Sequence, residues 1–212
     1  MKSIRTIIAA FFVTLFLGAG IAGAFSVDLT YPNETGLPPN TTYATVNGTV
    51  DLGDPSIFHF DIKLPDTLSG SLGGGKNFGM DQFFFNTDLS FLNGGMFKNW
   101  DPSTWKISTN TNADGFGVFD LKLTDPGKRT DHLLFDIDYI KDVTDADFFI
   151  LSDSPAGHGK GHFAAHIGGF NKYVPGSTFV RDEENPIPEP GTMVLLGISL
   201  LTVAGYMRRM NK

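Results

Sequence analysis

Three histidines in the last third of the chain have a spacing that points to metal chemistry. His158, His162 and His166 are four residues apart, and on a helix this spacing would place all three rings on one face, as zinc ligands are placed. Glycines interrupt the segment, however, and glycine disfavours a helix interior. On a strand, His162 and His166 would lie about 13 Å apart, too far for one metal ion. We therefore expect a structural role, with the intervening apolar residues toward the core and the histidines on the more open side.

Acidic side chains are the second candidate for chemistry. The chain has 19 Asp and only 4 Glu, and six Asp residues fall within 136–153. Their carboxylates could bind Ca²⁺, but the twelve-residue loop with a closing Glu is missing, so we favour a solvated strand face and keep calcium as an alternative. Two Asp facing each other across a cleft would instead support glycoside hydrolysis, and the sequence singles out no pair. The six residues are Asp136, Asp138, Asp142, Asp145, Asp147 and Asp153.

Other catalytic motifs are incomplete or missing. The stretch 70–77 is similar to a phosphate-binding loop, but Asn77 stands where that loop needs Ser or Thr, so a flexible glycine-rich loop is favoured. The chain has no cysteine, which excludes thiolate nucleophiles and thiolate metal ligands. No serine lies in a G-x-S-x-G turn.

Aromatic and asparagine residues offer weaker signals for glycans. Trp100 and Trp105 could stack on sugar rings, although aromatics at such positions more often belong to the core. N-x-T triplets begin at Asn33, Asn40 and Asn47, and we interpret them as turn and strand chemistry.

The elements that would position these residues are strands. Apolar and polar residues alternate at 58–64, 119–123 and 133–139, which is typical of antiparallel strands with one buried face. Gly, Asp and Pro separate these stretches, and no long helical pattern occurs between the two ends of the chain. We predict an all-β, antiparallel β-sandwich of the jelly-roll-like kind, a single domain at 25–180. Further expected strands are 43–51, 80–87, 105–109, 147–152 and 162–170.

The N-terminus has the features of a secretory signal peptide. Two basic residues precede an apolar run at 7–17, and Ala22 and Ala24 form an A-x-A site for signal peptidase. Cleavage there would remove residues 1–24 and make Phe25 the first mature residue. We therefore expect the protein to cross the inner membrane.

The C-terminus combines a proline-rich segment, an apolar run and a basic end. At about 1.5 Å per residue the uncharged run gives a helix of roughly 25 Å, enough for a single transmembrane helix across a thin bilayer. Two arginines would hold the end of the chain on the cytoplasmic side as a stop-transfer signal. In order, the parts are a Pro/acidic linker at 181–190 with Pro188, Glu189 and Pro190, the helix at 191–207, and a basic tail at 208–212 with Arg208 and Arg209.

This order of parts resembles the PEP-CTERM sorting signal of Gram-negative bacteria. The resemblance implies that exosortase, a membrane-embedded enzyme, processes the tail and delivers the protein to the cell surface or to an exopolysaccharide matrix. The segment 161–167 also looks like one that recurs before the tail of other PEP-CTERM proteins, for which no activity follows. Expected partners are exosortase, signal peptidase, the inner membrane before processing, and exopolysaccharide.

The charge of the exported part narrows its function. Residues 25–190 contain 11 of the 16 basic residues and all 23 acids, a net charge of −12, which disfavours nucleic acids and anionic lipid surfaces. We expect a non-enzymatic protein of the cell surface or matrix that needs no cofactor and binds glycan or matrix. The alternatives are an exported carbohydrate-active enzyme that uses Asp carboxylates, and a structural protein without a specific ligand.

Overall fold

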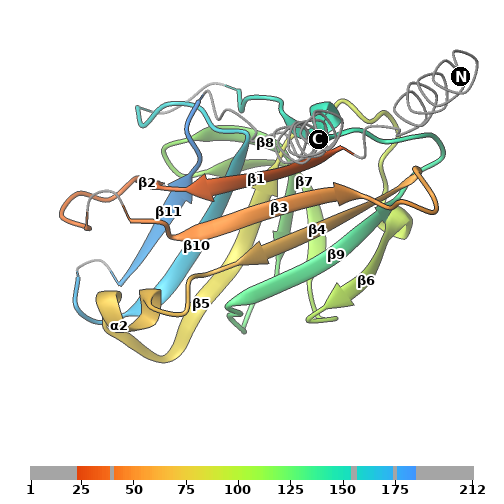
Figure 1. The fold of residues 1–212 in the computed structure, drawn as a ribbon. Coiled ribbons are helices and arrows are strands. Elements are labelled where there is room, and N and C mark those ends of the chain that lie inside the picture. Colours follow the sequence, from red (N-terminus) through yellow and green to blue (C-terminus); the bar gives the residue numbers. More distant parts are fainter. Residues whose placement is uncertain (1–22, 39–40, 154–156, 174–175, 185–212) are drawn as a thin grey trace, which may run out of the picture.

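Two antiparallel β-sheets packed face to face make up the folded part of the chain (Figure 1). The computed structural model describes residues 23–38, 41–153, 157–173 and 176–184. The expected all-β, antiparallel fold class is confirmed within these ranges.

Sheet A has five strands, which lie in the order β1 (Ala24–Leu29), β3 (Ala44–Val50), β4 (Ile57–Lys63), β9 (His132–Asp138) and β6 (Phe97–Asp101). The alternation predicted at 58–64 and 133–139 is confirmed, because β4 and β9 each bury every second residue. These two strands are neighbours, with Phe60 opposite Phe135. The polar residues between them therefore form one row on the outer face of the sheet.

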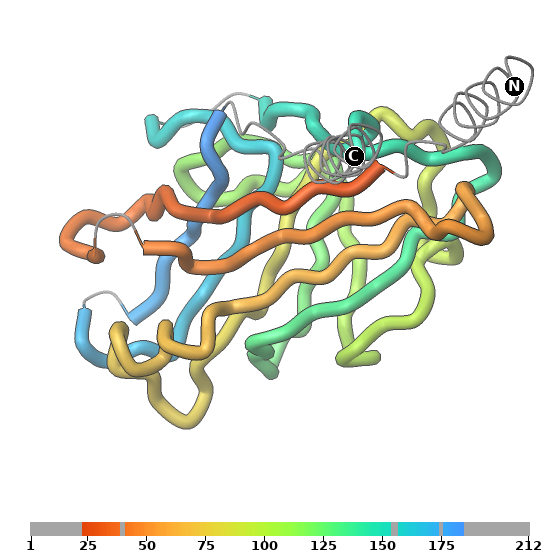
Figure 2. Tube along the Cα trace, in the orientation of Figure 1, coloured from red at the N-terminus to blue at the C-terminus, as the bar shows by residue number. Residues whose placement is uncertain are grey.

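Sheet B has six strands, which lie in the order β2 (Tyr31–Pro32), β11 (Ser177–Arg181), β10 (Phe163–Phe170), β5 (Gly74–Phe85), β8 (Gly117–Thr124) and β7 (Lys106–Ala113). Three connections are hairpins within one sheet, β3–β4, β7–β8 and β10–β11. The other seven connections in the described chain cross from one sheet to the other, as the tube in Figure 2 lets the reader follow. Residues far apart in the sequence are therefore brought side by side at the ends of the strands.

Some local predictions are wrong. The stretch 147–152 is not a strand, because a short 3₁₀ helix, η2 (Asp145–Phe148), precedes an irregular segment. The glycine-rich stretch 70–77 is not a loop: α2 (Leu68–Leu72) ends there at Gly73, whose φ of 69° suits glycine, and β5 begins at the next residue. A second 3₁₀ turn, η1 (Gly94–Met96), leads into β6.

Phenylalanine rings fill the space between the sheets. Phe25 of sheet A stacks on Phe163 of sheet B with ring centroids 5.4 Å apart, and Phe60 stacks on Phe135 at 4.8 Å. Phe60 also contacts Phe85 of sheet B at 5.4 Å. Burying one such ring contributes about 2–3 kcal/mol, so this cluster supplies much of the free energy that holds the two sheets together.

A second, smaller apolar cluster lies on the outer face of sheet B. Phe84 and Ala164 alternate with residues of the main core on β5 and β10, so they point to the opposite side of the sheet. They pack against Phe116 and Phe119, and all four are fully buried. Ser152 helps to cover this cluster, since its hydroxyl donates to the Phe116 carbonyl at 2.5 Å. Sheet B is therefore buried on both faces over part of its area.

The folded domain continues past its expected end at residue 180. Strand β11 runs to Arg181, and the side chain of Asp182 is completely buried. The stretch 181–184, which was expected to be linker, is thus part of the domain, because its charged side chains have partners in the fold. The described part of the domain therefore extends to residue 184.

Candidate functional site

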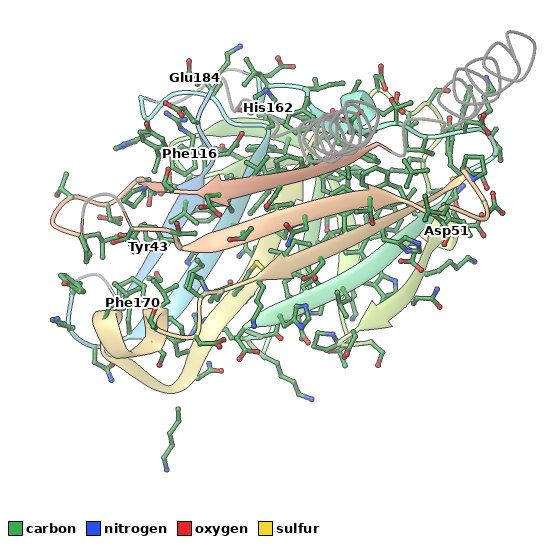
Figure 3. All side chains as sticks on the ribbon, in the orientation of Figure 1. Tyr43, Asp51, Phe116, His162, Phe170 and Glu184 are labelled. Carbon is green, nitrogen blue, oxygen red and sulfur yellow. The ribbon has the colours of Figure 1, made fainter. Side chains whose placement is uncertain are left out.

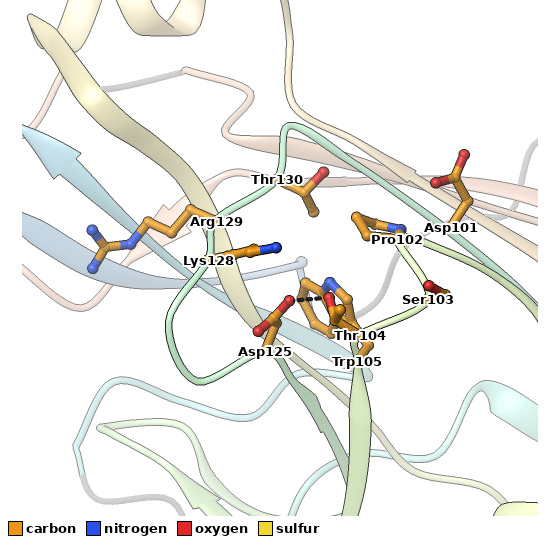
Figure 4. Close-up of a pocket in the computed structure, with 9 residues that line it drawn as sticks. All are labelled: Asp101, Pro102, Ser103, Thr104, Trp105, Asp125, Lys128, Arg129 and Thr130. Atoms are coloured by element: carbon orange, nitrogen blue, oxygen red, sulfur yellow. Dashed lines mark hydrogen bonds between the residues drawn. The ribbon is translucent and has the colours of Figure 1, made fainter.

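A hollow of about 360 Å³ lies between two turns at the edge of the sandwich (Figure 4). One turn joins β6 to β7 and the other joins β8 to β9. The hydroxyl of Thr104 donates a hydrogen bond to the buried carboxylate of Asp125, which ties the two turns together. The residues that line the hollow are Asp101, Pro102, Ser103, Thr104, Trp105, Asp125, Lys128, Arg129 and Thr130.

The hollow combines hydrogen-bond acceptors and donors. In Figure 4, Lys128 extends toward the turn that holds Pro102, whereas Arg129 points away from it. Trp105 lines the hollow but is only 5% exposed, because its ring belongs to the main core. Carboxylates, hydroxyls and an ammonium group in one concave site can exchange hydrogen bonds with a polyhydroxylated ligand.

Both tryptophan rings pack against the main core. Trp100 is half-buried and stacks on Phe97 and Phe135 with ring centroids 5.7 and 5.2 Å apart. Trp105 is buried in the main core. The core interpretation of both residues is therefore the one that the packing supports.

Four of the five histidines lie against aspartates. His59 contacts Asp136 at 2.6 Å and Asp51 at 3.0 Å on the outer face of sheet A. The other pairs are His132 with Asp61 at 2.8 Å, His162 with Asp182 at 2.8 Å, and His166 with Asp81 at 2.6 Å.

The three histidines at a spacing of four do not share a ligand. His162 and His166 contact different aspartates, and the ring of His158 packs edge-on against Phe116. Across the described ranges, no group of three His, Cys, Asp or Glu side chains could hold a metal ion. The expectation that His162 lies on an open side is wrong, because it is 7% exposed.

Asp182 and His162 form a buried clasp at the end of the domain. One oxygen of Asp182 accepts the backbone N–H groups of His162 and Phe163, both at 2.9 Å, and the other contacts His162 Nδ1 at 2.8 Å. A carboxylate with this many partners can be buried without a large penalty. We call Asp182, His162 and the neighbouring Arg181 the C-terminal clasp.

Arg181 adds hydrogen bonds and cation–π contacts to the C-terminal clasp. Its Nε donates to the His158 carbonyl at 3.0 Å, and a second guanidinium nitrogen donates to the Asp182 carbonyl at 2.6 Å. The guanidinium also lies over the rings of Tyr31 and Phe116, 4.8 and 5.7 Å from their centroids. Figure 3 shows His162, Phe116 and Glu184 at the same edge of the molecule.

A half-buried network joins the hollow to strand β10. Arg129 Nε donates to Asp81 at 2.9 Å, and the other oxygen of Asp81 contacts His166 at 2.6 Å. The guanidinium lies so close to Gly168 that a Cβ there would meet it at 2.7 Å. Arg129 is therefore held away from the hollow, and Lys128 is the cation that faces it.

The acids proposed for calcium are dispersed. Asp136 contacts His59 and Asn99, and Asp153 pairs through its backbone with Val118 in an isolated bridge. Asp147 accepts the N–H and the hydroxyl of Thr144 at the start of η2. These observations give each of the three a structural partner.

Asp88 and Asp147 are a pair of interacting carboxyls. Partial desolvation raises the pKa of Asp88, and a hydrogen bond with Asp147 and its negative charge raise that pKa further. A carboxyl whose pKa is raised beside a second carboxyl is a known feature of acid–base sites. In glycosidases, however, the two groups lie roughly 5 Å or more apart, with the substrate between them.

Two of the N-x-T asparagines have structural surroundings. The side-chain amide oxygen of Asn33 accepts the N–H of Phe179 and the hydroxyl of Thr178, both at 3.0 Å. Asn47 lies on β3 between Ser26 and Asp61 of the neighbouring strands. Asn40 lies outside the described residues.

Most of the targeting residues also lie outside the described part of the chain. These are Ala22, Pro188, Glu189, Pro190, Arg208 and Arg209, together with the helix expected at 191–207. Ala24 is the first residue of β1 and pairs with Thr49. Within the described residues, no helix is long and apolar enough to span a membrane.

Comparison with protein families identifies the class. Residues 186–209 match the PEP-CTERM protein-sorting motif, which confirms the resemblance noted from the sequence. The motif implies an exported protein, made as a membrane-anchored precursor and processed by exosortase. Comparisons with characterised proteins and with solved structures gave no significant match.

Proposed function

We propose that the exported domain is a non-enzymatic protein of the cell surface or extracellular matrix that binds a neutral glycan in the hollow between Asp101 and Thr130. The observation that carries this proposal is the lining itself, where Asp125, Thr104 and Lys128 bring acceptors and donors into one concave site. Exopolysaccharide is the matching ligand class, because exosortase systems accompany its production. The exported part carries a net charge of −12, so an anionic polymer would be repelled.

Support for a binding domain also comes from the topology. We infer that the sandwich is jelly-roll-like, because seven connections cross between the sheets and gather loops at the strand ends. Loops on a rigid sandwich are common places for ligand sites. The proposal needs no metal, and calcium would enter only if titration raised the affinity.

Calorimetric titration with two kinds of polymer tests the proposal. The tail-processed protein should bind a neutral polysaccharide such as dextran or the producing bacterium's own polymer more tightly than alginate, which is anionic. Lys128→Ala should lower the affinity about tenfold, the usual loss for one hydrogen-bonding group in a site. Lys172→Ala, at an exposed position outside the hollow, is the matched control. Equal binding by both variants, or no binding to any glycan, would contradict the proposal and favour a purely structural protein.

A second candidate is an exported carbohydrate-active enzyme that uses Asp88 and Asp147. The raised pKa of Asp88 beside a second carboxyl is the observation that favours it. The hydrogen bond between the two carboxyls argues against it, because the two acids of a glycosidase are separated by the substrate. The role of Asp147 at the start of η2 argues for structure instead. Release of reducing ends from the polysaccharide, abolished in Asp88→Asn, would replace the first proposal with this one.

A further inference from the structure

The C-terminal clasp holds the chain in place as far as Glu184. The Glu184 carboxylate accepts the backbone N–H of Lys160 at 3.0 Å and lies 4.0 Å from the guanidinium of Arg181. A Cβ at Gly159, whose φ is 83°, would meet that guanidinium and the Glu184 carboxylate at 2.6 Å. The loop around Gly159 therefore closes directly over residues 181–184, and the fold fixes the point at which the chain leaves it.

Very little chain separates Glu184 from the sorting tripeptide. The matched motif starts at residue 186, and Pro188 is the fourth residue after Glu184. At no more than about 3.6 Å per residue, the chain between these two residues spans at most about 14 Å. A compact domain of about 160 residues has a radius of gyration of about 15 Å. The tripeptide therefore stays within about one domain radius of Glu184.

An enzyme that processes the tail must fit into this short distance. The motif implies processing by exosortase, and a binding site for the tripeptide has to surround part of it. The outer surface of the enzyme then approaches the end of the domain that carries Glu184. The uncharged run begins later, at Gly191, after a span of up to about 25 Å. The enzyme is therefore a closer neighbour of this end than the bilayer core is.

The surface beside the clasp combines a held aromatic ring with acidic side chains. Tyr31 is 43% exposed, and its ring centroid lies 4.8 Å from the Arg181 guanidinium. Its hydroxyl donates to the Glu183 carboxylate at 3.4 Å. Glu183, Glu184 and Asp114 are exposed. We call Tyr31, Asp114, Glu183 and Glu184 the clasp face. Tyrosine is enriched in protein–protein contacts, whereas acids are repelled by anionic lipids.

We propose that the clasp face contacts exosortase while the enzyme processes the tail. The short connection brings the face and the enzyme together, and the C-terminal clasp keeps the face in a fixed position relative to the start of the tail. The acids of the face fit a basic surface on the enzyme. This proposal rests on the sorting motif and does not depend on glycan binding.

Photo-crosslinking in the producing bacterium tests the contact. In the full-length precursor, Tyr31 is replaced by p-azidophenylalanine, an aromatic residue of similar size, and the cells carry a tagged, inactive exosortase so that the complex accumulates. The same replacement of Leu52 is the control, because Leu52 is 90% exposed and follows Asp51, which Figure 3 shows well away from Glu184. We expect several-fold more exosortase adduct from position 31 than from position 52.

Lengthening the connection tests its part in the contact. Twelve Gly and Ser residues inserted between Glu184 and Asn185 raise the maximum span to Pro188 to about 58 Å. The adduct from position 31 should then fall to the level of position 52. The melting temperature of the domain should stay unchanged, because the insert follows the last residue that the clasp holds. Equal adduct from both positions, adduct with lipid in place of exosortase at position 31, or an adduct that survives the insertion would overturn the proposal.

Discussion

Both sheets carry histidine–aspartate pairs, one on the exposed face of sheet A and one at the start of β10 in sheet B, but the surroundings of the two pairs differ. On sheet A, His132 and Asp61 are 41% and 48% exposed, and water can replace either partner. On sheet B, the side chains of His162 and Asp182 are 8% and 0% exposed, and two backbone N–H groups donate to the same carboxylate. The same two residue types therefore form a minor surface contact in one place and a fixed part of the fold in the other.

The difference follows from what covers each sheet. Sheet A presents a polar row to solvent, as its alternating pattern predicts. Sheet B is covered on its outer side by the cluster around Phe84 and by the segment that contains Ser152. Burial strengthens electrostatic contacts and makes their loss more costly. The C-terminal clasp thus holds the last segment of the described domain, which ends at residue 184. The sorting motif starts two residues later, at 186.

The largest effect should come from removing the buried carboxylate. Asp182→Ala leaves the N–H groups of His162 and Phe163 without an acceptor, so we expect a loss of about 3–5 kcal/mol in the free energy of unfolding. Asp61→Ala, which removes the partner of His132, should cost less than about 1 kcal/mol. Urea denaturation of both variants measures the two values. Similar losses for the two variants would show that burial does not decide how much such a pair contributes to stability.

An intermediate effect should follow from the half-buried network on sheet B. Asp81→Ala removes the partner of both Arg129 and His166, whose side chains are 22% and 16% exposed. We expect a loss of about 1–3 kcal/mol in the free energy of unfolding, between the two cases above. Thermal unfolding with the His166→Gln variant as the control checks this order. A loss as small as that of Asp61→Ala would mean that the network contributes no more to stability than an exposed pair does.

The smallest effect should be a pH dependence on sheet A. Burial lowers the pKa of His59, but hydrogen bonds and charges from Asp136 and Asp51 outweigh it and raise that pKa above its usual value. The hydrogen bond from His59, followed by backbone N–H groups, lowers the pKa of Asp51. The contact should stabilise the fold most between about pH 4 and 6.5.

The loss of stability on each side of this pH range can be measured. Stability from His59 is complete below about pH 6.5, its unfolded pKa, and is lost as pH rises through its higher folded pKa. Stability from Asp51 is lost as pH falls through its lowered pKa. The melting temperature of the parent should therefore decline above neutral pH more than that of His59→Gln. Parallel profiles for the two proteins would contradict this assignment.

The sequence predicted those strands that bury one face and expose the other, because their apolar and polar residues alternate. Apolar and polar residues alternate in β4, β8 and β9 because one face of each strand contacts solvent. β11 is too short to show such a pattern, and β6 has no regular alternation. β10 buries both faces over much of its length, so its pattern could not show which side is the core.

The partners of the functional residues could not be predicted. The spacing of His162 and His166 was visible, but their aspartates lie 20 and 85 residues away. Thr104 and Asp125 of the hollow are 21 residues apart and meet only because two turns share one edge. Such contacts depend on the order of strands in the sheets, which local periodicity does not encode.

The intact mass of the protein recovered from the surface and medium of its own bacterium tests the central claim, that a folded domain ending at residue 184 is exported and cut from its tail. We predict a chain that begins at Phe25 and ends near Pro188, Glu189 and Pro190, with or without an added group. Alanine at these three positions should leave the full-length tail on the protein. A recovered mass that still includes residues 191–212 would contradict the claim and show a permanent membrane anchor.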